Sequence, residues 1–146
     1  MAGIDSKNVV NGHFGSIFHE GAWLANFNKA EAKVEIKKAE LKLSGDRWVR
    51  HKVLSLKGTG SISGFKVTSE LITFNSPVAN NSNTSVRTEL IYKLDDPEAY
   101  GMERIRLMNV MFDEIQLANW ETGKEISEEW KFTFEGYEVL DPIEES

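Results

Sequence analysis

The stretch from Lys29 to Leu43, KAEAKVEIKKAELKL, combines the composition of a helix with the order of a strand. Ala32, Val34 and Ile36 alternate with charged residues. On a helix, residues two apart point about 200° apart, so these three side chains would form no single apolar stripe. On a strand they share one face and the charges share the other. The order therefore predicts a strand with one densely charged face.

The alternation changes phase at Lys37-Lys38, and apolar residues then continue at Ala39, Leu41 and Leu43. Because one extra residue flips the faces of a strand, a β-bulge or tight bend is expected near Lys38. Two strand segments joined at a kink are therefore predicted. An ordinary strand with a solvated polar face explains the alternation equally well.

The rest of the chain is typical of short strands separated by turns. Small residues around Gly58-Thr59-Gly60 indicate close backbone approach at the start of a strand. Thr68 or Ser69 is a candidate cap for a short helix, SELITF, and a polar loop is expected over 76–85. The expected strands cover about 15–20, 29–43, 58–67, 86–94, 102–112, 114–120 and 128–139.

These elements predict a mainly β fold, a small β-sandwich or barrel with one short helix. The 146 residues suit a single domain over 1–146, with a flexible N-terminus at about 1–10 and an acidic C-terminal tail at about 141–146. Trp130 alternates with polar residues and is expected in the core, and Trp23 is expected to pack as well.

The segment RWVRHKVLSLKGTG, residues 47–60, is expected to begin with a long basic loop. It also holds Trp48 and several aliphatic residues, so it either folds over the domain or contacts a neighbour. Trp and Arg are enriched at interfaces, which makes Trp48 a candidate anchor. Core packing explains Trp48 equally well.

The composition excludes several classes of protein. A net charge of -6 argues against a general nucleic-acid or membrane-surface binder, and the absence of Cys excludes disulfides and thiolate chemistry. No apolar run reaches membrane-spanning length, and the first residues lack the apolar core of a secretory signal, so folding in the cytoplasm is expected. Charge is uneven, at +4 over Lys29 to Lys52 and -7 over Glu121 to Ser146.

No catalytic, cofactor or metal site is predicted, and the chain is not expected to be an enzyme. His13, His19 and His51 lack metal-ligand spacing. The glycines near residue 60 precede no long helix, which argues against a phosphate-binding loop.

Four stretches in order resemble a known family: NGHFGSIFHEG, EAKVEIKKAELKLSG, RHKVLSLKGTGSISGFKVTS and IRLMNVMFDEIQLANWETGKEISEEWKFTFEGYEV. They resemble the tail tube proteins of contractile phage tails, of the kind found in PBSX-type defective prophages and related phages. The resemblance spans about residues 11–142, and KGTGSISGFKVTS and the FDE…EEWKFTFEGYEV end are its strongest parts.

The resemblance implies hexameric rings stacked into a hollow tube inside a sheath, with four strands per subunit lining the channel and a long loop reaching the adjacent ring. The implied partners are further copies of the chain, the tail sheath, the baseplate and the tail terminator, with DNA passing without specific binding and with no membrane anchor. The implied location is the virion tail, assembled in the bacterial host cytoplasm. Candidate lumen-facing residues are Glu31, Lys33, Glu35 and Lys37. Candidate inter-ring residues are Arg47, Trp48, Arg50, His51, Lys52 and Leu54. The basic members could meet an acidic surface on the next ring, and Trp48 and Leu54 would add buried apolar area.

Two alternatives remain open at the level of sequence. One is a monomeric β-barrel that binds a small ligand or carbohydrate, with Trp48 or Trp120 as a stacking platform. The other is the tube protein of a DNA-free bacteriocin or of a secretion apparatus. A channel for DNA should repel phosphate, whereas the charges over 31–37 sum to zero, so the sequence leaves the charge of the lumen undetermined.

Overall fold

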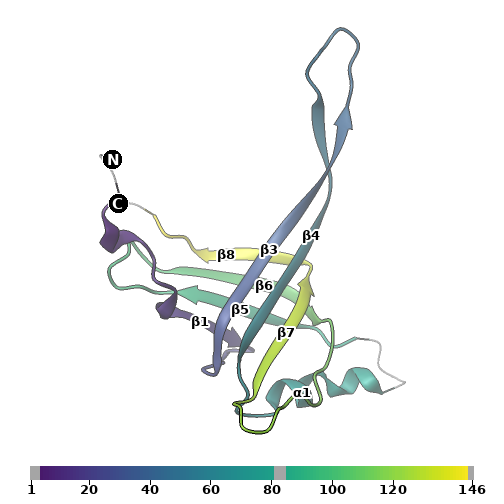
Figure 1. The fold of residues 1–146 in the computed structure, drawn as a ribbon. Coiled ribbons are helices and arrows are strands. Elements are labelled where there is room, and N and C mark those ends of the chain that lie inside the picture. Colours follow the sequence, from purple (N-terminus) through teal and green to yellow (C-terminus); the bar gives the residue numbers. More distant parts are fainter. Residues whose placement is uncertain (1–3, 81–84, 145–146) are drawn as a thin grey trace.

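The computed structural model describes residues 4–80 and 85–144 and is dominated by one antiparallel sheet (Figure 1). The strands are β1 (Gly15–His19), β2 (Ala22–Trp23), β3 (Phe27–Leu41), β4 (Arg50–Phe65), β5 (Thr88–Leu94), β6 (Glu103–Phe112), β7 (Ser127–Phe134) and β8 (Gly136–Asp141). One short helix, α1 (Glu70–Asn75), and the 3-10 turns η1 (Ser6–Asn8), η2 (Gly12–Phe14) and η3 (Ser76–Ala79) complete the described chain. The predicted mainly β fold is confirmed.

The sheet folds back on itself at β6. Its strand order is β2-β1-β5-β6-β7-β4-β3, with β8 also paired to β6. Asn109 has a positive φ of 53°, a conformation that Asn tolerates better than most residues. Before this bend β6 pairs with β8, and after it Met111 and Phe112 pair with β7. The bend divides the sheet into the β3 half (β3, β4, β7 and the end of β6) and the β5 half (β1, β2, β5, β8 and the start of β6).

The hydrophobic core lies between the two halves. Trp130 and Phe132 of β7 are at most 1% exposed, and they pack with Ile62 of β4. The β5 half contributes Leu90 and Leu107. The predicted core position of Trp130 is therefore confirmed, whereas Trp23, expected to pack, is 63% exposed in the single chain.

Close backbone approach at the glycines of β4 is confirmed. A Cβ atom on Gly58 would lie 2.5 Å from the ring of Phe134, and one on Gly60 would lie 2.6 Å from the ring of Phe132. These positions face each other in the β4–β7 ladder. The rings of Phe132 and Phe134 therefore lie directly over the backbone of β4, where a side chain larger than hydrogen would collide with them.

The predicted long loop after the second strand is wrong, because β4 begins at Arg50 and not at Gly58. Its first residues pair with β3 as far as Leu41, so a β-hairpin projects from the body of the molecule (Figure 1). A dense row of charges is typical of a loop. Here the β3–β4 ladder satisfies the hydrogen-bonding groups of the backbone, and the charged side chains stay in solvent. The register shift falls between Lys37 and Lys38, where a bulge was predicted, although the extra residue belongs to β4.

Two further strand boundaries differ from prediction. Residues 114–120 form no strand, because the backbone leaves the edge of β7 after Asp113, whose N–H bonds Lys131 at 2.8 Å. The predicted strand 128–139 is two strands, broken at Glu135, where the chain passes from one half of the sheet to the other.

The helix prediction is confirmed over Glu70–Asn75, although the side chain of Ser69, a predicted cap, makes no capping hydrogen bond. Part of the predicted polar loop forms η3, and residues 81–84 lie outside the described residues. So do residues 1–3 of the predicted flexible N-terminus and residues 145–146 of the acidic tail.

Candidate assembly surfaces

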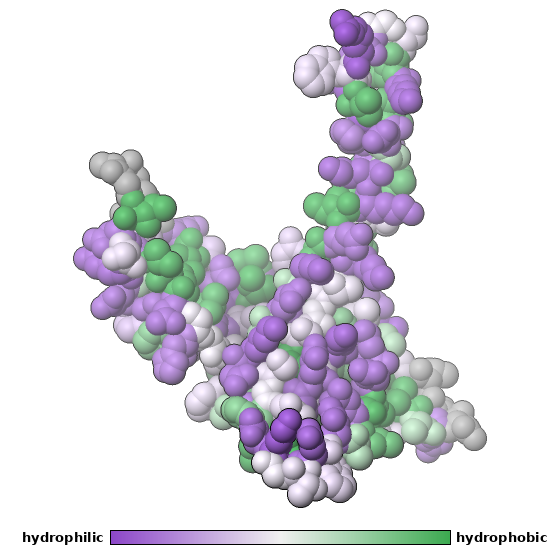
Figure 2. All heavy atoms as spheres, in the orientation of Figure 1, coloured by the Kyte–Doolittle hydropathy of each residue, from purple (hydrophilic) through white to green (hydrophobic). Residues whose placement is uncertain are grey.

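A continuous polar face covers the side of the β3 half that points away from the core. It is the face turned toward the viewer in Figure 2. The ladder sets Glu31 opposite Ser61 and Lys33 opposite Thr59, and these β4 residues stand opposite Lys131 and Thr133 of β7. The four residues predicted from the alternation, Glu31, Lys33, Glu35 and Lys37, are all exposed and share this face.

Charges of both signs are interspersed on this polar face. Across β3, β4 and β7 it carries five lysines against three glutamates, a net charge of +2. Short hydroxyl side chains of β4 and β7 lie between them. The charged members are Lys29, Glu31, Lys33, Glu35, Lys37, Lys57, Glu129 and Lys131.

Tyr92 supports β3 from behind the polar face. Its hydroxyl donates to the backbone oxygen of Glu31 at 2.9 Å, with the oxygen of Ser61 at 3.3 Å. Burial raises the pKa of the Tyr92 hydroxyl above its usual value, and the Glu31 carboxylate raises it further. The hydroxyl therefore stays protonated, as donation requires. Sequence reasoning missed this residue, because alternation in β5 shows that Tyr92 points inward but not what its hydroxyl reaches.

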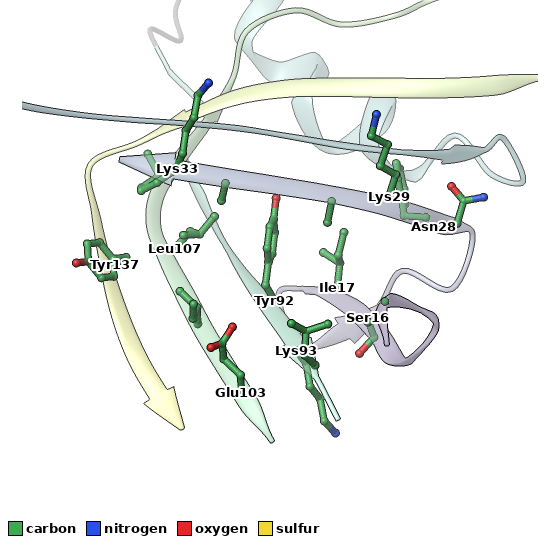
Figure 3. Close-up of a pocket in the computed structure, with 18 of the residues that line it drawn as sticks. Ser16, Ile17, Asn28, Lys29, Lys33, Tyr92, Lys93, Glu103, Leu107 and Tyr137 are labelled. Carbon is green, nitrogen blue, oxygen red and sulfur yellow. The ribbon is translucent and has the colours of Figure 1, made fainter. Parts of the chain in front are cut away.

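A cavity of about 560 Å³ lies between the two halves, around Tyr92 (Figure 3). Ile17, Leu107 and Val34 contribute apolar walls. Figure 3 shows Tyr92 pointing from β5 toward β3, while the amino group of Lys33 points away from the cavity. Neither Trp48 nor Trp120, the predicted stacking platforms for a ligand, lines it.

The projecting part of the β3–β4 hairpin, residues 38–54, is here called the hairpin arm. No side chain of the arm belongs to the core, and hydrophilic and hydrophobic residues mix along it (Figure 2). Its apolar residues include Leu43, Val53 and Leu54, each more than half exposed. Such a concentration of exposed apolar side chains on a narrow projection is typical of a surface that a partner covers.

The arm holds all six predicted inter-ring residues, Arg47, Trp48, Arg50, His51, Lys52 and Leu54, and all are exposed. The ladder puts Arg50 and Lys52 on one face of the arm and His51 on the other. Trp48 lies at the turn with 79% of its surface exposed.

Asp46 orders the turn of the arm. Its carboxylate accepts the Trp48 N–H and the Arg50 Nε–H, each at 2.9 Å. The Arg50 charge is therefore paired within the arm. Among residues 4–80 and 85–144, Arg47 and Lys52 form no ion pair and remain available to a partner.

The described part of the chain contains no group of three or more metal-ligating side chains of the His, Asp or Glu type placed to hold an ion. Within the same residues, no helix is long and apolar enough to cross a membrane.

Comparison with known proteins identifies the family of the chain. A family model described as "Phage tail tube protein" matches residues 2–141. The chain belongs to the phage tail tube protein family. A curated relative, the phage-like element PBSX protein XkdM of Bacillus subtilis strain 168, is 28% identical over 144 residues, which is 98% of each chain. The chain is a structural subunit of a tail tube.

Solved structures agree with the fold of this tail tube protein. A chain from the sheath-tube complex of an extracellular contractile injection system, in its extended state, superposes with a TM-score of 0.72 at 7% identity and covers 96% of this chain and 99% of that one. The tube-terminating cap of the anti-feeding prophage superposes with a TM-score of 0.75 at 7% identity, over 97% of this chain and 100% of that one. At this identity the likeness concerns the fold.

Proposed function

We propose that the chain, as a single domain, assembles into hexameric rings that stack into a hollow tube, with the polar face lining the channel. The observation that carries this proposal is the polar face itself, in which charged and hydroxyl side chains cover one side of the β3 half, while its other side packs on the core. Such a sheet suits the wall of a wide, water-filled barrel.

The free edge of β3 supports closure into a ring. β3 is 15 residues long and ends the strand order, so one of its edges has no partner strand within the described chain. A long unpaired edge invites uncontrolled association unless another strand covers it. Pairing around a closed ring covers six such edges at once.

The proposed partners are further copies, the tail sheath, the baseplate and the tail terminator. One structural neighbour belongs to a sheath-tube complex, and the family is that of a phage tail component. The role is structural, without catalysis, and assembly takes place in the host cytoplasm before the tube becomes part of the virion tail.

DNA passes through the proposed channel without specific binding. The net charge of +2 on the polar face favours a second candidate, the tube of a particle that carries no DNA, because lysines attract phosphate. The two kinds of particle differ in one observable. An intact particle that conducts DNA contains DNA protected from nuclease added before the particle is opened, and a DNA-free particle does not.

Single cysteines test the lining of the channel, since the natural chain contains none. Lys33→Cys and Glu35→Cys place a thiol on the polar face, and Glu138→Cys places one on the outer side of β8, where Glu138 lies beside Arg106. In assembled tubes, a bulky polymer-linked maleimide should label Glu138→Cys and leave both polar-face thiols unmodified. After dissociation all three should react. Equal labelling of all three in intact tubes contradicts the proposal.

A further inference from the structure

The end of the molecule opposite the hairpin arm carries a second exposed surface, the base loop, residues 113–126. Leu117 is 73% exposed and Trp120 is 70% exposed. The loop is held at both ends, by the Asp113 N–H to Lys131 and by the Lys66 N–H to the Ile126 oxygen, each at 2.8 Å. The base loop is therefore anchored at both ends and exposes two large apolar side chains between them.

The base loop and the hairpin arm have opposite charge. The base loop holds four carboxylates and one lysine, a net charge of -3. The arm holds five Lys or Arg and two Asp or Glu, a net charge of +3. Each surface also presents one exposed tryptophan, Trp120 on the base loop and Trp48 on the arm. Charge steers association and large aromatic side chains supply much of the contact energy at interfaces.

Within one molecule the two surfaces are far apart. β4 runs from Arg50 at the arm to Phe65, and Phe65 pairs with Ser127 next to the base loop. The 16 residues of β4 span roughly 50 Å at the usual rise of a strand. Figure 1 shows the arm and the base loop at opposite ends of the β3–β4 hairpin. The opposite charges therefore meet only between copies.

We infer that the base loop is the surface that receives the hairpin arm of a copy in the adjacent ring, with Trp48 and Trp120 inside the contact. This inference rests on the proposed stacking of rings and adds the identity of the receiving surface. Two different patches on one subunit give a head-to-tail contact, which repeats along an axis without limit. The cavity between the sheet halves is a poorer receiver, because Glu103 is the one carboxylate among the described residues that line it, whereas the arm is basic.

Charge reversal tests the pairing. An arm variant carries Arg47→Glu and Lys52→Glu, which spares the Arg50–Asp46 pair. A base variant carries Glu114→Lys and Glu125→Lys, which spares the pair of Glu121 with Lys124. Each variant alone should form rings but lose tubes, and the two combined in one chain should restore tubes. A control with Glu98→Lys and Glu144→Lys, outside both surfaces, should stack as the natural chain does.

The outcomes separate the inference from the proposed function. Normal tubes from the base variant, or no tubes from the combined chain, overturn the assignment of the base loop and leave the tube itself intact. Failure of the natural chain to form rings overturns the proposed function.

Cross-linking gives an independent readout. A chain with both Val49→Cys and Asn119→Cys, exposed positions beside Trp48 and Trp120 that keep both tryptophans, should yield a ladder of linked chains on a denaturing gel after assembly and treatment with a short bis-maleimide. Either substitution alone should yield no ladder. Tubes of the double variant that give no ladder overturn the contact.

Discussion

The hydroxyl of Tyr92 donates a hydrogen bond to the backbone oxygen of Glu31 at 2.9 Å, and this bond joins the β5 half to the strand whose side chains form the polar face. The side chain of Glu31 points away from the core, while its carbonyl is held from behind. Glu31 therefore contributes its side chain to the polar face and its backbone oxygen to the bond with the β5 half. The polar face thus depends on the Tyr92 hydroxyl behind it.

Tyr92→Phe should lower the free energy of unfolding by about 1–2 kcal/mol, because the backbone oxygen of Glu31 loses the hydroxyl that donates to it. Urea denaturation of the unassembled chain measures this. Tyr137→Phe is the matched control, since Tyr137 is 53% exposed and its hydroxyl has no hydrogen bond within the described residues. Equal losses for the two variants would contradict the role given to Tyr92.

Alkaline pH should expose the same bond. The pKa of the Tyr92 hydroxyl is raised in the folded state above its ordinary value of 10.0. Its contribution is therefore complete below pH 10 and is lost as pH rises above it, because only the unfolded chain readily releases the proton. The unfolding free energy of the natural chain should fall more steeply above pH 10 than that of Tyr92→Phe. Parallel pH profiles would contradict this.

Acid should weaken the packing around His19. Burial lowers the pKa of His19, although the carboxylates of Glu20 and Glu70 oppose the shift. Because the folded pKa lies below 6.5, stability is complete above that pH and is lost as pH falls below it. Thr88 donates its hydroxyl proton to Glu20, so neutral His19 donates from Nε2 to Thr88 Oγ1 at 3.0 Å.

The measurement for His19 is the unfolding free energy between pH 7.5 and 5.5 for the natural chain, His19→Gln and His13→Gln. His13 is exposed, so His13→Gln is the control. The natural chain and His13→Gln should lose stability in parallel as the pH falls. His19→Gln should start lower and lose less. A slope unchanged by His19→Gln would show that other groups cause the acid sensitivity.

Gly60→Ala should destabilise the fold by about 1–3 kcal/mol, because its Cβ would lie 2.5 Å from the Glu31 oxygen and 2.6 Å from the Phe132 ring. Thermal unfolding measures the loss. Gly12→Ala is the control, since nothing lies within 4 Å of an added Cβ there. If Gly60→Ala is as stable as Gly12→Ala, the close packing of β7 on β4 is wrong.

Shortening the hairpin arm should separate folding from stacking. Ala39 and Lys52 are paired in the ladder, so residues 40–51 can be replaced by a two-residue Asn-Gly turn. Because the arm adds nothing to the core, the unfolding free energy should change by no more than about 1 kcal/mol. Rings should persist and tubes should be lost, as size-exclusion chromatography and electron microscopy can show. Tubes of normal length from this variant would contradict the role of the arm.

Sequence patterns predicted β3, α1 and the close packing at Gly58 and Gly60, because each rests on local chemistry. Alternation fixes the faces of β3, the helix begins directly after Ser69 although its side chain makes no capping bond, and a missing Cβ indicates a close neighbour. The four polar-face residues followed from the same alternation.

The first half of β4 escaped prediction for a physical reason. Neither of its faces meets the core, so the usual distinction between inward apolar and outward polar residues disappears at His51, Lys52 and Val53. The bend at Asn109 and the break at Glu135 depend on which half of the sheet each segment joins. That choice is set by tertiary packing and not by local sequence. The first part of the base loop, residues 114–120, is predicted as a strand because Ile115 and Leu117 alternate with polar residues, yet Leu117 is exposed and the segment pairs with no strand.

The most direct test of the central claim is negative-stain electron microscopy of the purified chain across a range of concentrations. The account predicts rings with a central hole and sixfold symmetry, joining into hollow tubes as concentration rises. Monomeric particles at every concentration, also in the presence of a baseplate nucleus, would contradict it.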